Sequence, residues 1–415
     1  MRPFRFVHAA DIHLDSPFRG AHRADPALGK LLARSTFEAF ERIIALCIER
    51  EADALLVAGD VYDGADRSLR AQLAFQAGLE RLSEHGIRAF VAHGNHDPLD
   101  GWQAELRLPE GCHRFGGQPE TVPLDPGRPG WVALHGMSYP RRVVTENLAA
   151  RLRANEAAIN VAVLHATVGT QEGHDPYAPC SVADLERSGM DYWALGHVHE
   201  RQVIRPAGPA IVYPGNSQGR HIREPGARGV YVVELEAGGA PKLEFVATDV
   251  VRWARVVVRI DAMESEQDLI DGCLAASREP AAGSDGRYLL AVLRLTGSGP
   301  LRASLRREGF VDELREHLGL QLEAAGRRVA LAAIEEATRA EGLADEQDGL
   351  TFRAELLRQG HVRNGAPDSG EWWPSELEEL LDERRVRRYL DVRDRDDDLL
   401  QRASDRALEA LEAAR

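Results

Sequence analysis

Residues 54–63 read Ala54-Leu55-Leu56-Val57-Ala58-Gly59-Asp60-Val61-Tyr62-Asp63. The first five are apolar, a run as long as a buried strand, and the run stops at a glycine followed by acidic residues. Before it, residues 4–10 are strand-like and 36–50 have apolar residues at helical spacing. After it, 68–85 have a helical pattern and 87–92 are again strand-like. This alternation predicts βαβ units.

The alternation continues to about residue 245. Further strands are predicted at 132–134, 161–164, 192–195, 211–213 and 230–235, with a loop rich in Pro and Gly at 119–130. From about residue 252 a smaller α/β pattern follows, with strands at 256–260 and 288–295, helices at 265–278 and 301–318, and a run at 329–334 that fits either.

Leucines recur at helical spacing near the end of the chain, after a capping box at 375–378. We therefore predict three domains: 1–245, which holds the chemical motifs, an α/β unit over 246–340, and a helical region over 341–415.

Composition narrows the class of protein. The 415 residues exceed what one core usually organises. The 51 basic and 66 acidic residues give a net charge of −15, which argues against binding a polyanion through bulk charge alone. No run reaches the ~20 apolar residues of a membrane span, and the N-terminus lacks a signal-peptide pattern, so we expect a cytoplasmic protein. The four cysteines form no CxxC pair, so a zinc ribbon is not indicated.

Five apolar runs end in clusters of Asp, Asn or His side chains. In order these are Asp11-Ile12-His13, Gly59 to Asp63, Gly94-Asn95-His96-Asp97, His165, and Gly196-His197-Val198-His199. If the runs are neighbouring strands, the clusters lie along one edge of a sheet, where open α/β folds bind ligands. Oxygen and nitrogen donors without thiolates suit two divalent cations, with Asp60 as the bridging carboxylate. Such pairs hold a hydroxide and clamp a phosphoryl group. The glycines before Asp60, Asn95 and His197 are expected to permit sharp turns.

Each cluster alone has a simpler interpretation. An Asp-x-His sequence is usually a turn or a core pair, and Gly-Asn-His-Asp resembles turn chemistry. All five clusters in order favour the metal site. His8, inside the first strand, is expected in the core, and His93 is either a core residue or a hydrogen-bond partner of a ligand.

This succession of motifs resembles the calcineurin-like metallophosphoesterase superfamily. Within it the chain is similar to DNA-repair exonucleases of the SbcD and YhaO type, on the further stretches 173–181 and 213–224. The resemblance implies an α/β fold with a metallophosphoesterase β-sandwich flanked by helices, a small α/β capping domain and a helical C-terminal region. It also implies a metal-dependent DNA exonuclease, a hydrolase.

The resemblance assigns roles by position. One metal ion would be held by Asp11, His13, Asp60 and His199, and the second by Asp60, Asn95, His165 and His197. His96 would be the catalytic histidine that assists the leaving oxygen, with Asp97 orienting its ring. Two manganese ions are the expected cofactors, because Asp63 stands where related purple acid phosphatases have a tyrosine that binds iron.

Substrate and partners are inferred less directly. Arg220, His221 and Arg223 follow a glycine-rich turn and are expected to contact the phosphate backbone of DNA, the alternative being a solvated hairpin. In the family the nuclease works with an SMC-like coiled-coil ATPase, and the C-terminal helices are candidates to bind it, the alternative being that they pack on their own domain. A homodimer is left open. The competing function is a metallophosphoesterase for a small phosphate ester or cyclic nucleotide, which the acidic balance favours.

Overall fold

The computed structural model describes residues 2–18, 26–64, 68–102, 104, 106–124, 130–169, 177–278, 284, 286–324 and 328–339. The chain forms two compact units, one of 1–256, 277–292 and 319–333, and one of 257–276, 293–318 and 334 onward. The five polar clusters all lie in the first unit. The domain limits expected at 245 and 340 stay predictions, and the helices expected over 341–415 lie outside the described residues.

The first sheet contains the strands of the predicted βαβ units. Its order is β12-β11-β1-β2-β3-β4. β1 (Phe4–Ala9), β2 (Ala54–Ala58), β3 (Arg88–Ala92) and β4 (Cys112–Arg114) are parallel. β11 (Gly229–Leu235) and β12 (Lys242–Ala247) extend the sheet as antiparallel strands. The strands expected near 4–10, 54–58, 87–92 and 230–235 are thus confirmed.

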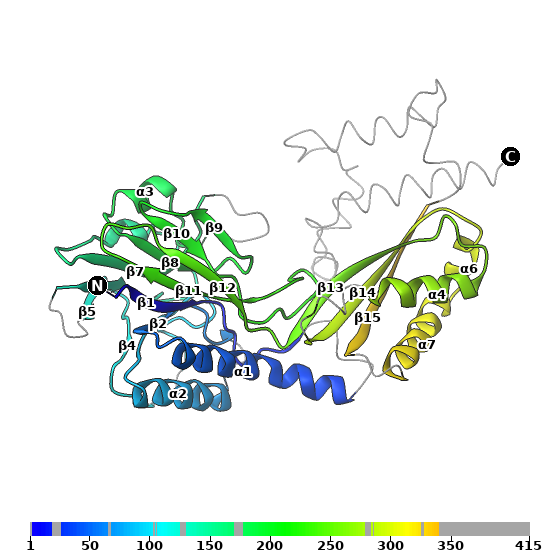
Figure 1. The fold of residues 1–415 in the computed structure, drawn as a ribbon, viewed down its shortest axis with the longest axis horizontal. Helices are drawn as coiled ribbons and strands as arrows, with labels where there is room; N and C mark the ends of the chain where they lie inside the picture. The colour runs from blue at the N-terminus through cyan, green and yellow to red at the C-terminus, as the bar shows by residue number, and fades with distance from the viewer. Residues whose placement is uncertain are drawn as a thin grey trace, which may run out of the picture. The chain divides into compact units, whose positions relative to one another are not determined.

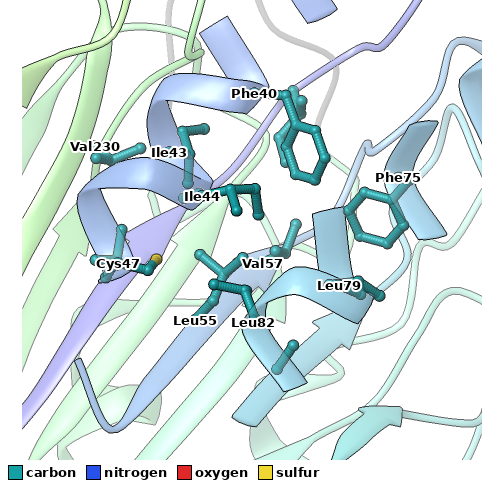
Figure 2. Close-up of a cluster of buried hydrophobic side chains, with 14 of the residues drawn as sticks. Phe40, Ile43, Ile44, Cys47, Leu55, Val57, Phe75, Leu79, Leu82 and Val230 are labelled. Atoms are coloured by element: carbon teal, nitrogen blue, oxygen red, sulfur yellow. The ribbon is translucent and has the colours of Figure 1, made fainter. Parts of the chain in front are cut away.

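Two helices cover one face of the first sheet, α1 (Pro26–Glu49) and α2 (Leu69–Glu84) (Figure 1). Ser68 caps α2, because its side-chain oxygen accepts the N–H of Ala71, which has no partner within the helix. Figure 2 shows the apolar faces of both helices meeting side chains of β2. The buried cluster there includes Phe40, Ile44, Leu55, Phe75 and Leu79. Each such side chain stabilises the fold by about 1.5–3 kcal/mol relative to exposure.

The second sheet has the order β5-β6-β7-β8-β10-β9. Its strands are β5 (Glu120–Leu124), β6 (Val132–Gly136), β7 (Ile159–His165), β8 (Tyr192–Gly196), β9 (Gln202–Arg205) and β10 (Ala210–Tyr213). The other face of the first sheet packs against it, since Phe6, Leu56 and Phe90 share one buried cluster with Val161, Val163 and Tyr192. The architecture is therefore a β-sandwich flanked by helices, as the family resemblance implied.

Residues 251–339 form a three-stranded sheet, β13-β14-β15, with helices beside it. The strands are β13 (Val251–Arg259), β14 (Tyr288–Gly297) and β15 (Val329–Thr338), and the helices are α4 (Glu266–Ala276), α6 (Arg302–Leu305) and α7 (Phe310–Ala324). The ambiguous run at 329–334 is thus a strand. The single helix expected over 301–318 is wrong: the chain breaks between α6 and α7, where Gly309 has φ +82°.

Some short elements were not expected from the sequence. β5 lies inside the stretch expected to be a loop, and it tolerates Pro123 because it is an edge strand of its sheet. α3 (Val182–Glu186) begins with a capping box between Ser181 and Asp184. Among the described helices, none is both long and apolar enough to cross a bilayer.

Candidate metal centre

The candidate ligands lie at the carboxyl ends of strands from two sheets. The sequence interpretation placed them along one sheet edge, and this is wrong: β1, β2 and β3 belong to the first sheet, whereas β7 and β8 belong to the second. Strand order depends on pairing between distant segments, which local patterns do not reveal. Because the sheets pack face to face, the two sets of strand ends converge. They bring together Asp11, His13, Asp60, Asn95, His165, His197 and His199.

Four of these residues have a left-handed backbone. Asp11, His13, Asp60 and His197 have φ of +49°, +48°, +51° and +103°. Such a conformation costs a residue other than glycine of order 1–3 kcal/mol and clusters at functional sites. The strained backbone turns each chain segment where its strand ends. It brings the side chains of Asp11, His13 and Asp60 close to histidines at the strand ends of the second sheet.

The glycines next to the ligands are required for two different reasons. Gly59 has φ +90°, as the sequence interpretation expected. Gly94 and Gly196 do not have positive φ; instead, a Cβ would lie 2.3 Å from Asp60 Oδ1 at Gly94 and 1.8 Å from the carbonyl oxygen of Ala58 at Gly196. A side chain at either position would push apart strand ends that must touch, so close approach requires the glycine.

The first group of candidate ligands is Asp11, His13 and His199, whose ligand atoms all lie within 4.8 Å of one another. The Nδ1 of His199 is 2.6 Å from Glu224 Oε1, so this nitrogen donates and Nε2 keeps its lone pair. That Nε2 is 3.3 Å from His13 Nε2 and 3.8 Å from Asp11 Oδ1. The lone pair of His199 Nε2 thus lies close to ligand atoms of Asp11 and His13, and a cation among these atoms would bind all three.

The second group is Asp11, Asp60 and His165, again with ligand atoms within 4.8 Å. The Nδ1 of His165 is 3.0 Å from the carbonyl oxygen of Ala58 and donates to it, which leaves the Nε2 lone pair facing Asn95 Oδ1 at 2.9 Å and Asp60 Oδ2 at 3.4 Å. His197 lies beside this group. Its ring centroid is 5.1 Å from that of His165, and its backbone N–H donates to Asp11.

The protonation of these groups fits a cation. Burial raises the pKa of Asp60 to about 7, and burial together with the charge of Asp60 raises the pKa of Asp11. Burial also lowers the pKa of His13 and of His199, and that of His165 to about 3, so these imidazoles are neutral ligands at ordinary pH. Without a cation the carboxylates are destabilised, and a divalent ion would favour their charged form. The donor set therefore fits two divalent ions.

His96 is oriented by Asp63. Its Nδ1 is 2.5 Å from Asp63 Oδ1, and its backbone N–H donates to Asp60 Oδ1 at 2.9 Å. Burial alone lowers the pKa of His96, but the hydrogen bond to Asp63 and the charge of Asp60 raise it overall. The other Asp63 oxygen accepts from Arg220 at 2.8 Å and from Ser16. The His96 imidazole, with its raised pKa, is thus held beside the ligand cluster.

Asp97 makes contacts that support the site from the backbone, and its expected role in orienting His96 stays a prediction. Its two oxygens accept the backbone N–H groups of Val61 at 2.8 Å and Gly94 at 2.7 Å, and Oδ2 lies 2.9 Å from His93 Nδ1. Asp97 therefore holds the turns after β2 and β3 through these backbone contacts. His93 thus contacts a residue that supports the site.

His8 is a core residue, as expected. Its Nδ1 is 3.0 Å from the hydroxyl of Tyr192 and its Nε2 is 3.2 Å from the carbonyl oxygen of Leu195. Burial lowers its pKa to about 3.

The loop expected to bind DNA has a buried and an exposed part. Arg220 lies inside: its side chain is 12% exposed, and its guanidinium donates to Ser16 Oγ at 2.7 Å as well as to Asp63. His221 is half-buried, with Nε2 3.3 Å from Glu224 Oε1, and Arg223 is exposed. The structure thus separates three residues that the sequence interpretation treated alike.

The sequence interpretation gave no role in orienting a histidine to two side chains that contact the site histidines, Asp63 and Glu224. Glu224 is 3% exposed. Burial alone raises its pKa, yet the hydrogen bond from His199 and the positive charge of Arg220 lower it well below the usual range. Asp63 belongs to the Gly-Asp motif and Glu224 ends the stretch 213–224, so both lie within the motifs that carry the family resemblance. Nothing in the motifs indicated which histidine each would contact.

Comparison with known proteins agrees with this geometry. The family described as Calcineurin-like phosphoesterase matches residues 4–201, and the middle domain of metallophosphoesterase YhaO matches 253–339. A protein of Bacillus subtilis (strain 168) named as an uncharacterized metallophosphoesterase, YhaO, is 38% identical over 316 residues, which cover 75% of this chain and 76% of that protein.

Two more distant relatives have names that refer to DNA or to a nuclease. The DNA double-strand break repair protein Mre11 of Methanopyrus kandleri is 29% identical over 305 residues, covering 64% of this chain and 61% of that protein. A second protein of Bacillus subtilis, named as a component of the nuclease SbcCD, is 26% identical over 273 residues, covering 56% of this chain and 67% of that protein. This chain thus spans less than two thirds of the Mre11 relative.

Proposed function

The chain belongs to the calcineurin-like phosphoesterase family, and on this premise we propose that it is a phosphodiesterase with two divalent metal ions that acts on DNA ends. The observation that supports this most is the convergence of seven oxygen and nitrogen donors from five strand ends, four of them on strained backbone. Thiolates are absent from the described cluster, which favours manganese over softer metals.

We assign one ion to Asp11, His13, Asp60 and His199, and the other to Asp60, Asn95, His165 and His197. When bound, such a pair supplies a nucleophilic water at neutral pH and stabilises charge on the phosphoryl oxygens.

The protein's own residues would orient and protonate the substrate. Asp63 accepts the Nδ1 proton of His96, so the second ring nitrogen is the one available to donate a proton to the leaving sugar oxygen. The raised pKa of His96 favours the form that carries this proton.

The choice of DNA over a small ester rests on the names of the distant relatives and is tested directly. Full-length protein in manganese is incubated in parallel with an end-labelled duplex and with a small chromogenic phosphodiester. We expect shortening of the duplex at low enzyme concentration and slow turnover of the small ester. Efficient cleavage of the small ester with an intact duplex would instead establish the alternative function, which the net charge of −15 favours.

Arg223 and His221 are the proposed contacts to the phosphate backbone, since they are the more exposed members of their loop. Arg223→Ala is expected to weaken DNA binding uniformly across sequences and to reduce the slope of log affinity against log salt by about one. Titrations at several salt concentrations measure this slope. Arg141→Ala, which removes an exposed arginine paired with Glu146, is the control. Unchanged affinity at every salt concentration would remove Arg223 from the interface.

We further propose that residues 341–415 bind an SMC-like coiled-coil ATPase. Co-purification of such a partner with the full chain, and its loss from a truncation ending near residue 340, is the expected result. Retention of the partner by the truncated chain would place the interface elsewhere.

A further inference from the structure

We propose that Glu224 is a positioning residue. One of its carboxylate oxygens orients the metal ligand His199. The other holds the backbone of Arg220, whose side chain holds Asp63, the residue that contacts His96. The inference rests on the proposed metal site and deepens it. It joins the two ends of the centre through one loop, residues 218–228.

The first set of contacts, called here the first arm, runs from Glu224 to the metal ligand His199. Oε1 of Glu224 lies 2.6 Å from His199 Nδ1, and the carboxylate is almost fully buried. This contact sets the tautomer and ring orientation, because only the donating Nδ1 faces the carboxylate and Nε2 is turned toward His13. A carboxylate behind a histidine ligand also makes the imidazole a stronger donor to a metal.

The second set of contacts, the second arm, runs from Glu224 through Arg220 and Asp63 to His96, the proposed catalytic histidine. Oε2 of Glu224 accepts the backbone N–H of Arg220 at 2.7 Å. The Arg220 guanidinium donates to Asp63 Oδ2 at 2.8 Å, and Asp63 Oδ1 is 2.5 Å from His96 Nδ1. The chain of contacts from His199 to His96 is therefore continuous, and Arg220 acts within it on Asp63.

The loop 218–228 is also anchored at both ends by side chains other than Glu224. Gln218 holds one end, since its side chain bonds the backbone of Val250 at 2.7 Å and of Val251 at 2.6 Å. Arg228 holds the other end by donating to the carbonyl oxygens of His199 and Pro225. Both anchors remain when Glu224 is replaced. A Glu224 variant therefore tests the contacts of this side chain with the centre and leaves the ends of the loop attached.

Two variants test the first arm in the full-length protein. Glu224→Gln keeps the size and one acceptor but removes the charge, and Glu224→Ala removes the contact. Manganese affinity is measured from the rise in melting temperature over a series of manganese concentrations, and ligand geometry from the visible absorption of the cobalt-substituted protein. We expect about 10-fold weaker affinity for Gln and up to about 100-fold for Ala, with an altered cobalt spectrum.

Asp249→Asn is the matched control. Asp249 is a buried carboxylate of the same unit, paired with Arg252 and Arg287. Its loss is expected to lower the melting temperature without changing manganese affinity. If both Glu224 variants bind manganese as the wild type does, and only their melting temperature falls, Glu224 is structural and the proposal fails. Absence of manganese binding in the wild type would refute the proposed function itself, a result distinct from the first.

Arg220→Gln tests the second arm. With manganese saturating, we expect a lower kcat on duplex DNA, an unchanged KM and unchanged manganese affinity, because Arg220 acts through Asp63. If instead KM rises, kcat stays unchanged and the slope of log affinity against log salt becomes smaller, Arg220 is a phosphate contact, and the second arm of the proposal is wrong.

Discussion

Replacing His96 by alanine is expected to lower phosphodiester turnover about 10²- to 10⁴-fold while leaving manganese binding unchanged. The imidazole is held by Asp63 at 2.5 Å; it forms a third cluster with His13 and Asp63, but it is not among the ligands that we assign to either ion. What His96 gives to Asp60 is its backbone N–H, which alanine retains. The substitution therefore removes the proton donor and spares the donor set.

The two effects are measured on the same preparation. Turnover is followed with the duplex and with the small diester, and metal binding by the manganese-induced rise in melting temperature. His113→Ala is the control, since that histidine in β4 pairs with Glu120 at 2.8 Å, outside the centre. Loss of manganese binding in His96→Ala would show that His96 is a ligand and would overturn this division of roles.

Replacing Asp60 by asparagine is expected to abolish the stabilisation that manganese gives. Asp60 lies within reach of both groups, with Oδ2 3.4 Å from His165 Nε2 and 3.9 Å from His13 Nε2. A ligand at 100 times its Kd stabilises a fold by about 2.7 kcal/mol. Asparagine has no charge to bridge two ions, so most of this increment should vanish at the same manganese concentration, and activity with it.

Without metal, Asp60→Asn should raise the stability of the protein at neutral and higher pH, whereas with manganese it lowers it. The pKa of Asp60 is raised to about 7 by burial, so between about pH 4 and 7 the folded state holds a proton that the unfolded chain has released. Stability without metal therefore falls as pH rises through this window. Asp60→Asn should flatten the decline and make the metal-free protein at least as stable as the wild type at pH 8.

Urea unfolding at pH 5 and pH 8, with chelator or with manganese, measures both effects. Asp53→Asn is the control, because Asp53 precedes the same strand at its opposite end, where it accepts the backbone N–H of Arg5. A wild-type manganese response in Asp60→Asn would exclude Asp60 as the bridging group.

Much of the fold follows from local patterns. β2 was predicted to the residue, and β1 and β3 to within one residue at either end, because a buried parallel strand is a short apolar run bounded by polar residues. The break at Gly309 and the edge strand at Pro123 were missed, the first because one glycine with positive φ interrupts an otherwise helical pattern, the second because a strand with a proline depends on its place at the edge of a sheet.

The site divides in the same way. Which residues carry donor atoms is a local property, and all seven candidate ligands come from motifs that end apolar runs. Which carboxylate contacts which histidine is not local. Asp97 directly follows His96 in its motif, whereas Asp63 belongs to another motif, yet it is Asp63 that contacts the His96 ring, and the Asp97 oxygens accept the N–H groups of Val61 and Gly94.

The sequence by itself determined the strands that carry the site, the donor atoms and the family. Each of these depends on short segments whose polarity and spacing are enough to identify it. Only the tertiary structure decided that the donors come from two sheets, and that Asp63 and Glu224 hold His96 and His199. The physical reason is that a hydrogen bond of 2.5 to 2.6 Å between groups 25 or more residues apart depends on which strands pair and on how the loops after them pack. No single segment specifies that packing.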